Sequence, residues 1–385
     1  MDKTFSRFTI HTKKELMSLF FQGKTEYKAQ SLQAIAWRKF RKNKQGMFLL
    51  CFLGFITLIA TLGYLVTPDS TSYSNEQILE IRLQKPFSKV TFLAIPKNQP
   101  IQKRNFITKM LNGQPSFHTY IPISKYWFSA DSVYVELFNE PPPYNQASYS
   151  LADVALPIVQ KTYYLGTDRY GRDVLSQLII GARVSLSVGF VSVFIALIIG
   201  VFLGAVGGYF RGKIDDAIMW LINVVWSIPT LLLVIAISFA LGAGFWQIFV
   251  AIGLTMWVDI ARVVRGQVIS LREKEFVEAS KALGFKGLPI IFKHILPNIT
   301  GTVIVIAAAN FASAILTEAS LSFLGIGVQP PMPSWGMMIK EYCGYIILDY
   351  AYLAIIPGIA IMLLVLCFML LGNVIRDILD VKTNE

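Results

Sequence analysis

The chain has 385 residues, of which 54% are apolar and 15% are charged, and its mean hydropathy is +0.53. This composition lies well outside the average of soluble proteins and indicates a membrane protein. The formal net charge of +11 does not indicate a nucleic-acid partner, because the Lys and Arg residues lie beside the ends of apolar segments, where they are typical of topology signals.

Five or six apolar segments are long enough to cross a hydrocarbon core of roughly 30 Å, which takes about 20 residues of helix. The candidates are Gly46–Val66, Ser185–Phe210, Ala217–Leu241, Phe245–Ala261, Ile299–Phe323 and Ala351–Val374. Pro229 in the third and Pro357 in the sixth predict kinks. Because residues 1–45 are polar and basic rather than a secretory signal, the first span (46–67) is expected to be a retained anchor.

Basic residues flank the spans on one side of the membrane only. Five of them directly precede the first span, namely Arg38, Lys39, Arg41, Lys42 and Lys44. Seven more lie between the fourth and fifth spans, namely Arg262, Arg265, Arg272, Lys274, Lys281, Lys286 and Lys293. The positive-inside rule then places both termini and the loop 261–298 in the cytoplasm, which six crossings allow.

Residues 1–45 are predicted to form a cytoplasmic tail with an interfacial helix. The string SLQAIAWRKFRKNK mixes apolar and basic residues, and its Trp37 and Phe40 favour a helix in contact with membrane lipid. The earlier string ELMSLFF fits either such a helix or a loosely held tail.

Residues 68–164 are long for a loop between two spans. Ile81–Ile95 and Ser132–Phe138 alternate in polarity and are rich in Val, Phe, Tyr and Thr, which predicts short strands. Pro141–Pro143 breaks the stretch. We expect a small, mainly β extracytoplasmic insert between the first and second spans.

The core, residues 165–385, opens with the charged string LGTDRYGRDVLS. Asp168, Arg172 and Asp173 fit either a functional charged site or a polar turn with ion pairs and a helix-capping Asp. Further along, Gly200 and Gly204 have GxxxG spacing, which favours close helix packing. Glu318 is an ionisable group near membrane depth, so it either lines a path through the membrane or holds the following SLSFLGIG segment.

The loop 261–298 reads as two short helices with a bend. Leu271–Leu283 is predicted to be a helix, Gly284 to cap it with a positive φ, and Pro289 to begin a second helix that Pro297 ends. A polar helical loop between apolar runs fits either a docking surface for another protein or a solvated linker.

The string EASKALGFKGLPIIFKHILPN closely resembles the EAA loop of ATP-binding-cassette importer permeases. Further strings, among them LGTDRYGRDVLS, GARVSLSVGF and EASLSFLGIGVQPPMPSWGMMI, resemble the C-type permease subunit of oligopeptide, dipeptide and nickel importers. Ser280 replaces the third letter of EAA, and His294 stands where the broad pattern has Ile. The outer insert is the larger departure, because typical members have a much shorter connection there.

The resemblance implies an all-α polytopic protein of the bacterial inner membrane, with six transmembrane helices, a cytoplasmic EAA coupling loop and the β insert. In the family this loop docks on the ATPase, which assigns docking to Glu278, Ala279, Ser280, Gly284, His294, Leu296 and Pro297. The implied partners are a paralogous B-type permease, ATP-binding-cassette ATPase subunits and an extracytoplasmic solute-binding protein. The implied solutes are peptides or similar small molecules.

Enzymatic chemistry is not predicted. The sequence has no GxxxxGK[ST] phosphate loop, so ATP is expected to bind to partner subunits and this chain to need no cofactor. Three Cys and three His residues show no CxxC or grouped His pattern, and therefore predict neither a disulfide framework nor a metal site.

Two alternatives come from other classes. An ion-coupled secondary transporter would carry inverted repeats and buried coupling carboxylates near midspan, and the sequence has neither. A membrane-anchored adhesion or sensor protein would need only one span. A second EAS string, Glu318–Ser320, lies at the outer end of the fifth span and lacks the following Gly, so it is not expected to be a second ATPase dock.

Overall fold

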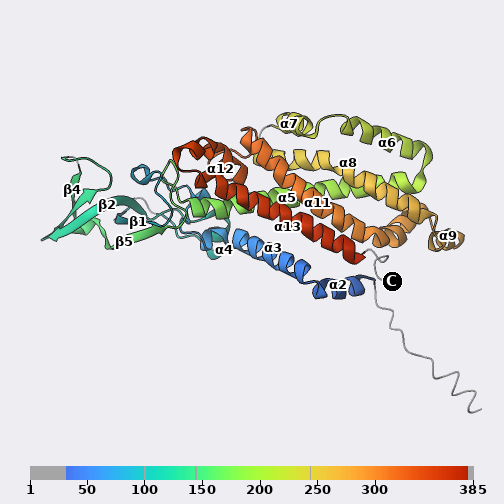
Figure 1. The fold of residues 1–385 in the computed structure, drawn as a ribbon, viewed down its shortest axis with the longest axis horizontal. Coiled ribbons are helices and arrows are strands. Elements are labelled where there is room, and N and C mark those ends of the chain that lie inside the picture. The colour runs from blue at the N-terminus through green and yellow to red at the C-terminus, as the bar shows by residue number, and fades with distance from the viewer. Residues whose placement is uncertain (1–31, 99–100, 144, 243, 380–385) are drawn as a thin grey trace, which may run out of the picture.

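A long helical bundle carries a β-sheet at one end in the computed structural model, which describes residues 32–98, 101–143, 145–242 and 244–379 (Figure 1). The helices are α2 (Leu32–Lys42), α3 (Lys44–Leu62), α4 (Phe106–Asn112), α5 (Val174–Phe210), α6 (Gly212–Trp226), α7 (Thr230–Ala240), α8 (Phe245–Arg272), α9 (Glu275–Ala282), α10 (Gly287–Ile290), α11 (Leu296–Phe323), α12 (Trp335–Tyr342) and α13 (Tyr352–Leu379). The predicted ELMSLFF helix lies outside the described residues.

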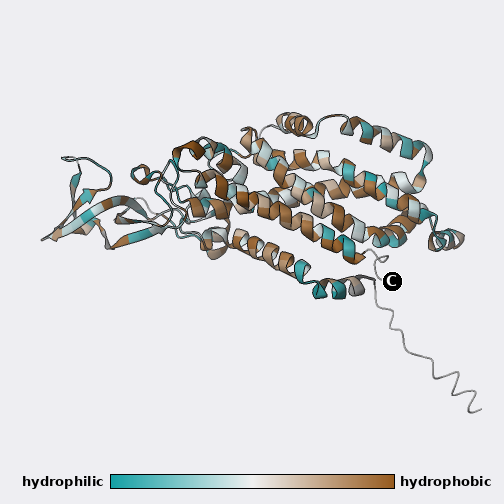
Figure 2. Cartoon of the chain, viewed as in Figure 1, coloured by the Kyte–Doolittle hydropathy of each residue, from teal (hydrophilic) through white to brown (hydrophobic). Residues whose placement is uncertain are grey.

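Five of the described helical segments are long and apolar enough to cross a membrane, and a sixth span results if α6 and α7 are counted together. The five are α3, α5, α8, the segment Gly287–Phe323 and α13. All six predicted spans fall on these helices. Several helices are longer than the predicted spans, because the hydrogen bonds of the helix backbone continue into polar sequence beyond each apolar segment. Figure 2 shows the apolar residues along the bundle and polar residues in α2 and α9.

The third predicted span is not one kinked helix. Its chain forms α6 and α7, which meet at 94° across a break at Ser227–Pro229. Pro229 has non-helical dihedral angles, φ −53° and ψ 123°. Proline lacks a backbone N–H and disfavours a helical conformation in the residue before it, which explains a break instead of a bend.

Glycines bring α5 and α8 into backbone contact. A Cβ on Gly204 would lie 2.4 Å from the carbonyl oxygen of Ala261, and one on Gly200 would lie 2.7 Å from that of Trp257. From the other side, a Cβ on Gly253 would lie 2.9 Å from the Ser192 carbonyl oxygen. The predicted GxxxG packing is therefore confirmed and extends over the length of the seam.

The sheet outside the bundle has five antiparallel strands in the order β4-β3-β2-β1-β5. Its strands are β1 (Ser88–Pro96), β2 (His118–Ser129), β3 (Ser132–Leu137), β4 (Gln146–Ser150) and β5 (Ala155–Tyr163). Phe92, Val133 and Val135 are fully buried in its two small hydrophobic clusters.

The predicted strand Ile81–Ile95 is wrong in its first half. Strand β1 begins at Ser88, and the preceding residues contain a 3-10 turn (Leu79–Ile81) and a positive φ at Leu83. The backbone there pairs with the LGTD loop instead of a strand: Leu83 N–H donates to the Asp168 carbonyl at 2.9 Å. The prediction Ser132–Phe138 is confirmed by β3.

The two ends of the bundle differ in what they carry. The sheet and α12 lie at one end, while α2, α9 and the last turn of α13 lie at the other (Figure 1). The basic clusters of the N-terminal tail and of the loop 261–298 therefore share one end, as the charge pattern predicts.

The glycine seam yields a prediction. Gly204→Val should lower the stability of the protein by about 1–3 kcal/mol, because the new methyl groups meet the backbone of α8. Gly266→Val is the matched control, since no atom lies within 4 Å of a Cβ at Gly266. Thermal unfolding of both purified variants in the same detergent checks this. Equal loss of stability in both would contradict the proposed seam.

Candidate functional site

The turn after α9 is a well-formed helix cap. Gly284 has φ +82°, and its N–H donates to the Lys281 carbonyl at 2.9 Å, while Phe285 N–H donates to the Ser280 carbonyl at 3.2 Å. This pair of bonds is the Schellman arrangement, which needs a left-handed residue after the helix. The predicted role of Gly284 as a cap is confirmed, because a side chain there would strain the backbone.

The α9 helix is shorter than predicted. The interval Leu271–Leu283 is divided, because α8 continues to Arg272 and α9 begins only at Glu275. Lys274 between them has an extended backbone. The helix propensity of these residues predicted one continuous helix. In the structure the chain changes direction after α8, which ends the helix.

The inner face of this loop is fixed to the bundle. Val277, Ile290 and Ile291 are buried in the same hydrophobic cluster as Tyr209 at the end of α5. A Cβ on Gly287 would lie 2.8 Å from the Tyr209 ring. The loop is therefore seated on α5 and α8 rather than hanging in solvent.

The outer face of the loop is exposed and carries large apolar residues. Leu283 is 78% exposed, and Phe276 and Phe285 are exposed with it. We call these three residues the apolar crown. Leu288 and Phe292 are exposed as well, but they line a groove with Leu197 and Phe202 of α5. Exposed apolar clusters mark sites of interaction with protein or membrane. Sequence reasoning did not assign the crown to the site, although the string EFVEASKALGFKGLPIIF contains it.

The predicted docking residues divide between the two faces. Glu278, Ala279, Gly284 and Pro297 are exposed, His294 and Leu296 are half-buried, and Ser280 is buried. The Ser280 hydroxyl donates to the Phe276 carbonyl at 2.8 Å, so this residue supports α9 from within. The ring of His294 lies against Phe285, with centroids 6.0 Å apart.

Pro297 does not end the second helix, contrary to the prediction. The chain runs from α10 through a π-helical turn (Ile291–Ile295) directly into α11, where Pro297 occupies the first turn. The wider π-turn accommodates a residue that has no N–H to donate. As a result the loop and the fifth predicted span are one continuous helical segment.

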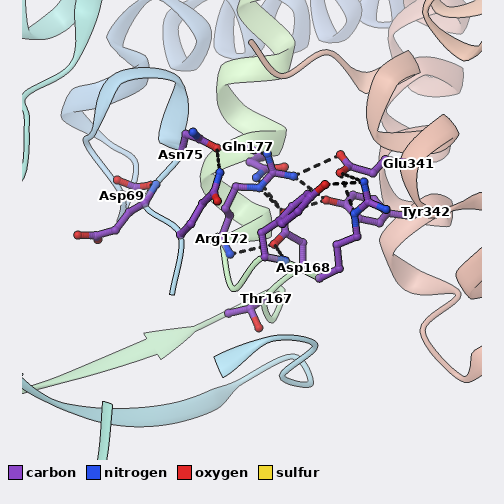
Figure 3. Close-up of polar contacts among 12 residues, drawn as sticks. Asp69, Asn75, Thr167, Asp168, Arg172, Gln177, Glu341 and Tyr342 are labelled. Carbon is purple, nitrogen blue, oxygen red and sulfur yellow. Dashed lines mark hydrogen bonds and ion pairs between the residues drawn. The ribbon is translucent and has the colours of Figure 1, made fainter. Parts of the chain in front are cut away.

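A buried polar network occupies the opposite end of the bundle. Asp168 is completely buried, and its carboxylate accepts hydrogen bonds from the Arg172 guanidinium at 2.6 Å, from Tyr342 at 2.8 Å and from Gln177 at 3.1 Å. In Figure 3, Arg172 reaches Asn75 on one side and Glu341 on the other, at 3.3 and 3.2 Å. The network joins the chain before the sheet, the start of α5 and α12.

The charges in this network are compensated. Burial acts to lower the pKa of Arg172, but Asp168, Tyr342 and Glu341 together outweigh it and raise that pKa above its ordinary value. Asp173 caps α5 by accepting a hydrogen bond from Ser176 N–H at 2.9 Å, although burial still raises its pKa. The string LGTDRYGRDVLS therefore forms an ion-paired and capped turn, and a functional role for its charges stays a prediction.

Glu318 is also fully buried, near the C-terminal end of α11. It accepts a hydrogen bond from Ser322 at 2.6 Å, and Ser322 in turn accepts one from Val328 N–H at 3.1 Å. Its second carboxylate oxygen has no partner among the described residues. These contacts favour the second interpretation, in which Glu318 holds the SLSFLGIG segment. Within the described residues, no group of three or more His, Cys, Asp or Glu is placed to hold a metal ion.

Comparisons with known proteins fit this architecture. Residues 196–384 match the binding-protein-dependent transport system inner membrane component family, and residues 31–86 match the N-terminal transmembrane domain of oligopeptide transport permease C. A glutathione transport system permease protein from Pectobacterium atrosepticum is 37% identical over 63% of this chain and 80% of its own length. A dipeptide transport system permease protein from Alkalihalophilus pseudofirmus is 43% identical over 58% and 73%.

An oligopeptide transport system permease protein from Haemophilus influenzae is 40% identical over 59% of this chain and 73% of its own. Among solved structures, a chain of the inward-facing MetNI methionine ABC transporter aligns with 53% of this chain and with 97% of its own length. The TM-score of this alignment is 0.46 and the sequence identity is 21%, and both values are too low for a detailed comparison. The chain belongs to the family of binding-protein-dependent transport system inner membrane components. It is thus a multi-pass membrane protein of a family of transport subunits, which are not enzymes.

The buried network yields a second prediction. Arg172→Gln should destabilise the protein by about 3–5 kcal/mol, because it leaves the buried Asp168 carboxylate without its charged partner. Arg169→Gln is the matched control: its pair with Glu341 is more exposed, and such pairs contribute about 0–1 kcal/mol. Thermal unfolding of the two purified variants checks the difference, and equal effects would argue against a structural role.

Proposed function

We propose that this chain is a permease subunit of an ATP-binding-cassette importer. With a paralogous B-type permease it forms the transmembrane path for di- or oligopeptides or a similar small solute. Separate ATPase subunits supply the energy and bind the ATP, and an extracytoplasmic solute-binding protein delivers the solute. The peptide class rests on the relatives, which are named for glutathione, dipeptide and oligopeptide transport.

The observation that carries the proposal is the apolar crown on the loop 273–298. It combines exposed Phe and Leu side chains with the charges of Glu278, Lys281 and Lys286, and protein interfaces likewise have an apolar centre and a polar rim. The crown lies at the end of the bundle that faces away from the sheet (Figure 1). That position suits a cytoplasmic ATPase.

The same loop is built to transmit movement. Its inner face contacts Tyr209 of α5 and the buried side of α8, and its C-terminal part continues into α11. A rigid loop that docks on a moving partner therefore displaces three spans together. Coupling of this kind requires that the partner bind two states of the permease with different affinity.

The outer insert is proposed to contact the solute-binding protein rather than the solute. The hairpin of β2 and β3 exposes Tyr126, Trp127, Phe128 and Tyr134, with the rings of Trp127 and Tyr134 stacked at 6.0 Å. This hairpin lies at the far end of the molecule from α9 (Figure 1). Aromatic residues in such a position are typical of interface anchors.

The proposed orientation is testable by labelling. A single Cys at Lys125, whose side chain is 74% exposed, should react with an impermeant maleimide in spheroplasts or intact cells without an outer membrane. A single Cys at Lys281 should react only after the membrane is opened, because the loop is proposed to be cytoplasmic. Both variants need Cys51, Cys343 and Cys367 replaced by Ser. Labelling of the Cys at position 281 from outside would contradict the proposed topology.

The docking role of the loop is tested at Gly284. Gly284→Asp should uncouple transport, because a side chain at φ +82° strains the cap and reorients the crown, while no span is altered. We expect the purified complex either to lose its ATPase subunits or to hydrolyse ATP without responding to loaded binding protein.

Gly212→Asp is the matched control for this experiment. Gly212 also has a positive φ, +57°, and open space around its Cβ position, but it is the first residue of α6, outside the loop. It should retain coupled ATP hydrolysis. Normal transport by Gly284→Asp at normal expression would show that the loop is a solvated linker.

A further inference from the structure

An apolar groove of about 470 Å³ runs between the N-terminal helices and the pair α11 and α13. Its lining includes Trp37 of α2, Leu50 of α3, Ile304 of α11, and Leu371 and Ile375 of α13. The volume falls within the range of about 300–1,000 Å³ that is usual for ligand sites.

The lining offers almost nothing to a polar ligand. Its one hydroxyl, on Thr300, already donates to the Pro297 carbonyl at 3.0 Å. Trp37 is 54% exposed, while its neighbour Phe40 is buried against the bundle, with the two rings stacked at 5.8 Å. The groove therefore suits a flexible hydrocarbon chain.

The helix that borders the groove is strongly basic. On α2, whose Trp37 and Phe40 line the groove, the side chains of Arg38, Lys39, Arg41 and Lys42 are exposed. Helical spacing places Lys39 and Arg41 on either side of the lining residues, and Arg38 and Lys42 toward the opposite face of α2. Among the residues that the structure describes, no carboxylate lies within 4.0 Å of Lys39 or Arg41. Two cations thus flank an apolar slot at the end of the bundle that carries α9 (Figure 1).

Close contacts fix the position of α2 beside the groove. Asn43 separates α2 from α3 and caps α3 by accepting a hydrogen bond from Gly46 N–H at 2.9 Å. A Cβ on Gly46 would lie 2.9 Å from Val374 of α13 and 3.0 Å from the Phe40 ring. Close contact at Gly46 therefore holds α2 next to α13, with two of its basic residues beside the groove.

We propose that this groove binds one anionic phospholipid of the cytoplasmic leaflet. An acyl chain lies in the slot beside Trp37, and the phosphate is held by Lys39 and Arg41 of α2. Guanidinium groups recognise phosphate by paired hydrogen bonds, and basic segments next to a span attract anionic lipid. Charge complementarity favours this occupant over an apolar protein helix, which would leave Lys39 and Arg41 unpaired.

The test measures quenching of Trp37 by brominated acyl chains. The purified full chain is placed in phosphatidylcholine nanodiscs that contain a minor, equal fraction of brominated phosphatidylglycerol or brominated phosphatidylcholine. Because the chain has 7 Trp residues, the Trp37 signal is the difference between the wild type and Trp37→Phe. We expect brominated phosphatidylglycerol to quench this signal several-fold more than brominated phosphatidylcholine.

The double variant Lys39→Gln, Arg41→Gln should abolish that preference. The variant Arg38→Gln, Lys42→Gln should keep it, because these two side chains lie toward the opposite face of α2. The variant Lys274→Gln, Lys286→Gln should keep it, since it removes exposed charges at the same end but away from the groove. Equal quenching by both lipids in the wild type would overturn the proposal. So would absence of quenching, because the groove would then be covered by protein, such as residues 1–31, residues 380–385 or a partner subunit.

Discussion

The backbone contact between α5 and α8 is the interaction on which the rest of the structure depends. In lipid there is no hydrophobic force between helices, so association relies on close packing. Gly200, Gly204 and Gly208 of α5 allow that approach along one face. Because α5 begins at the buried network around Asp168 and ends near Tyr209, which packs against the loop 273–298, this seam also links the two ends of the molecule.

The two ends are held by different forces. At the end that carries the sheet, buried charges and hydrogen bonds around Asp168 and Arg172 join three separate parts of the chain. Such a network fixes the relative positions of the segments that it joins, because each buried polar group needs its hydrogen-bond partner. At the other end the loop is seated by apolar contacts, and its outer face remains unpaired. The sheet end is therefore held rigidly by buried polar contacts, whereas the loop at the other end presents an exposed apolar surface.

The first span contributes differently. Both α2 and α3 lie at the side of the bundle, against α13, and enclose the apolar groove between them and α11. If lipid fills this groove, the membrane itself completes the packing of the N-terminal helices. The basic residues before the first span then serve both to orient the chain and to bind lipid, since both roles use the attraction between cations and the cytoplasmic leaflet.

Local sequence determined the helices, the cap at Gly284, the β3 strand and the sites of close packing, because hydrophobic periodicity, glycine and turn residues act over a few neighbouring positions. The resemblance to importer permeases came from strings of the same kind. Ion pairs within LGTDRYGRDVLS were also predicted, although the sequence did not say which residues pair.

Tertiary structure alone decided how these pieces meet. The break at Pro229, the start of β1 at Ser88 and the continuation of the loop through Pro297 into α11 all differ from the sequence expectation. In each case the backbone satisfies its hydrogen bonds with a distant segment or through an altered helical turn. The groove and the contacts of Arg172 with Asn75 and Glu341 likewise join residues far apart in the chain. No local pattern records such contacts, because they exist only once the helices have packed.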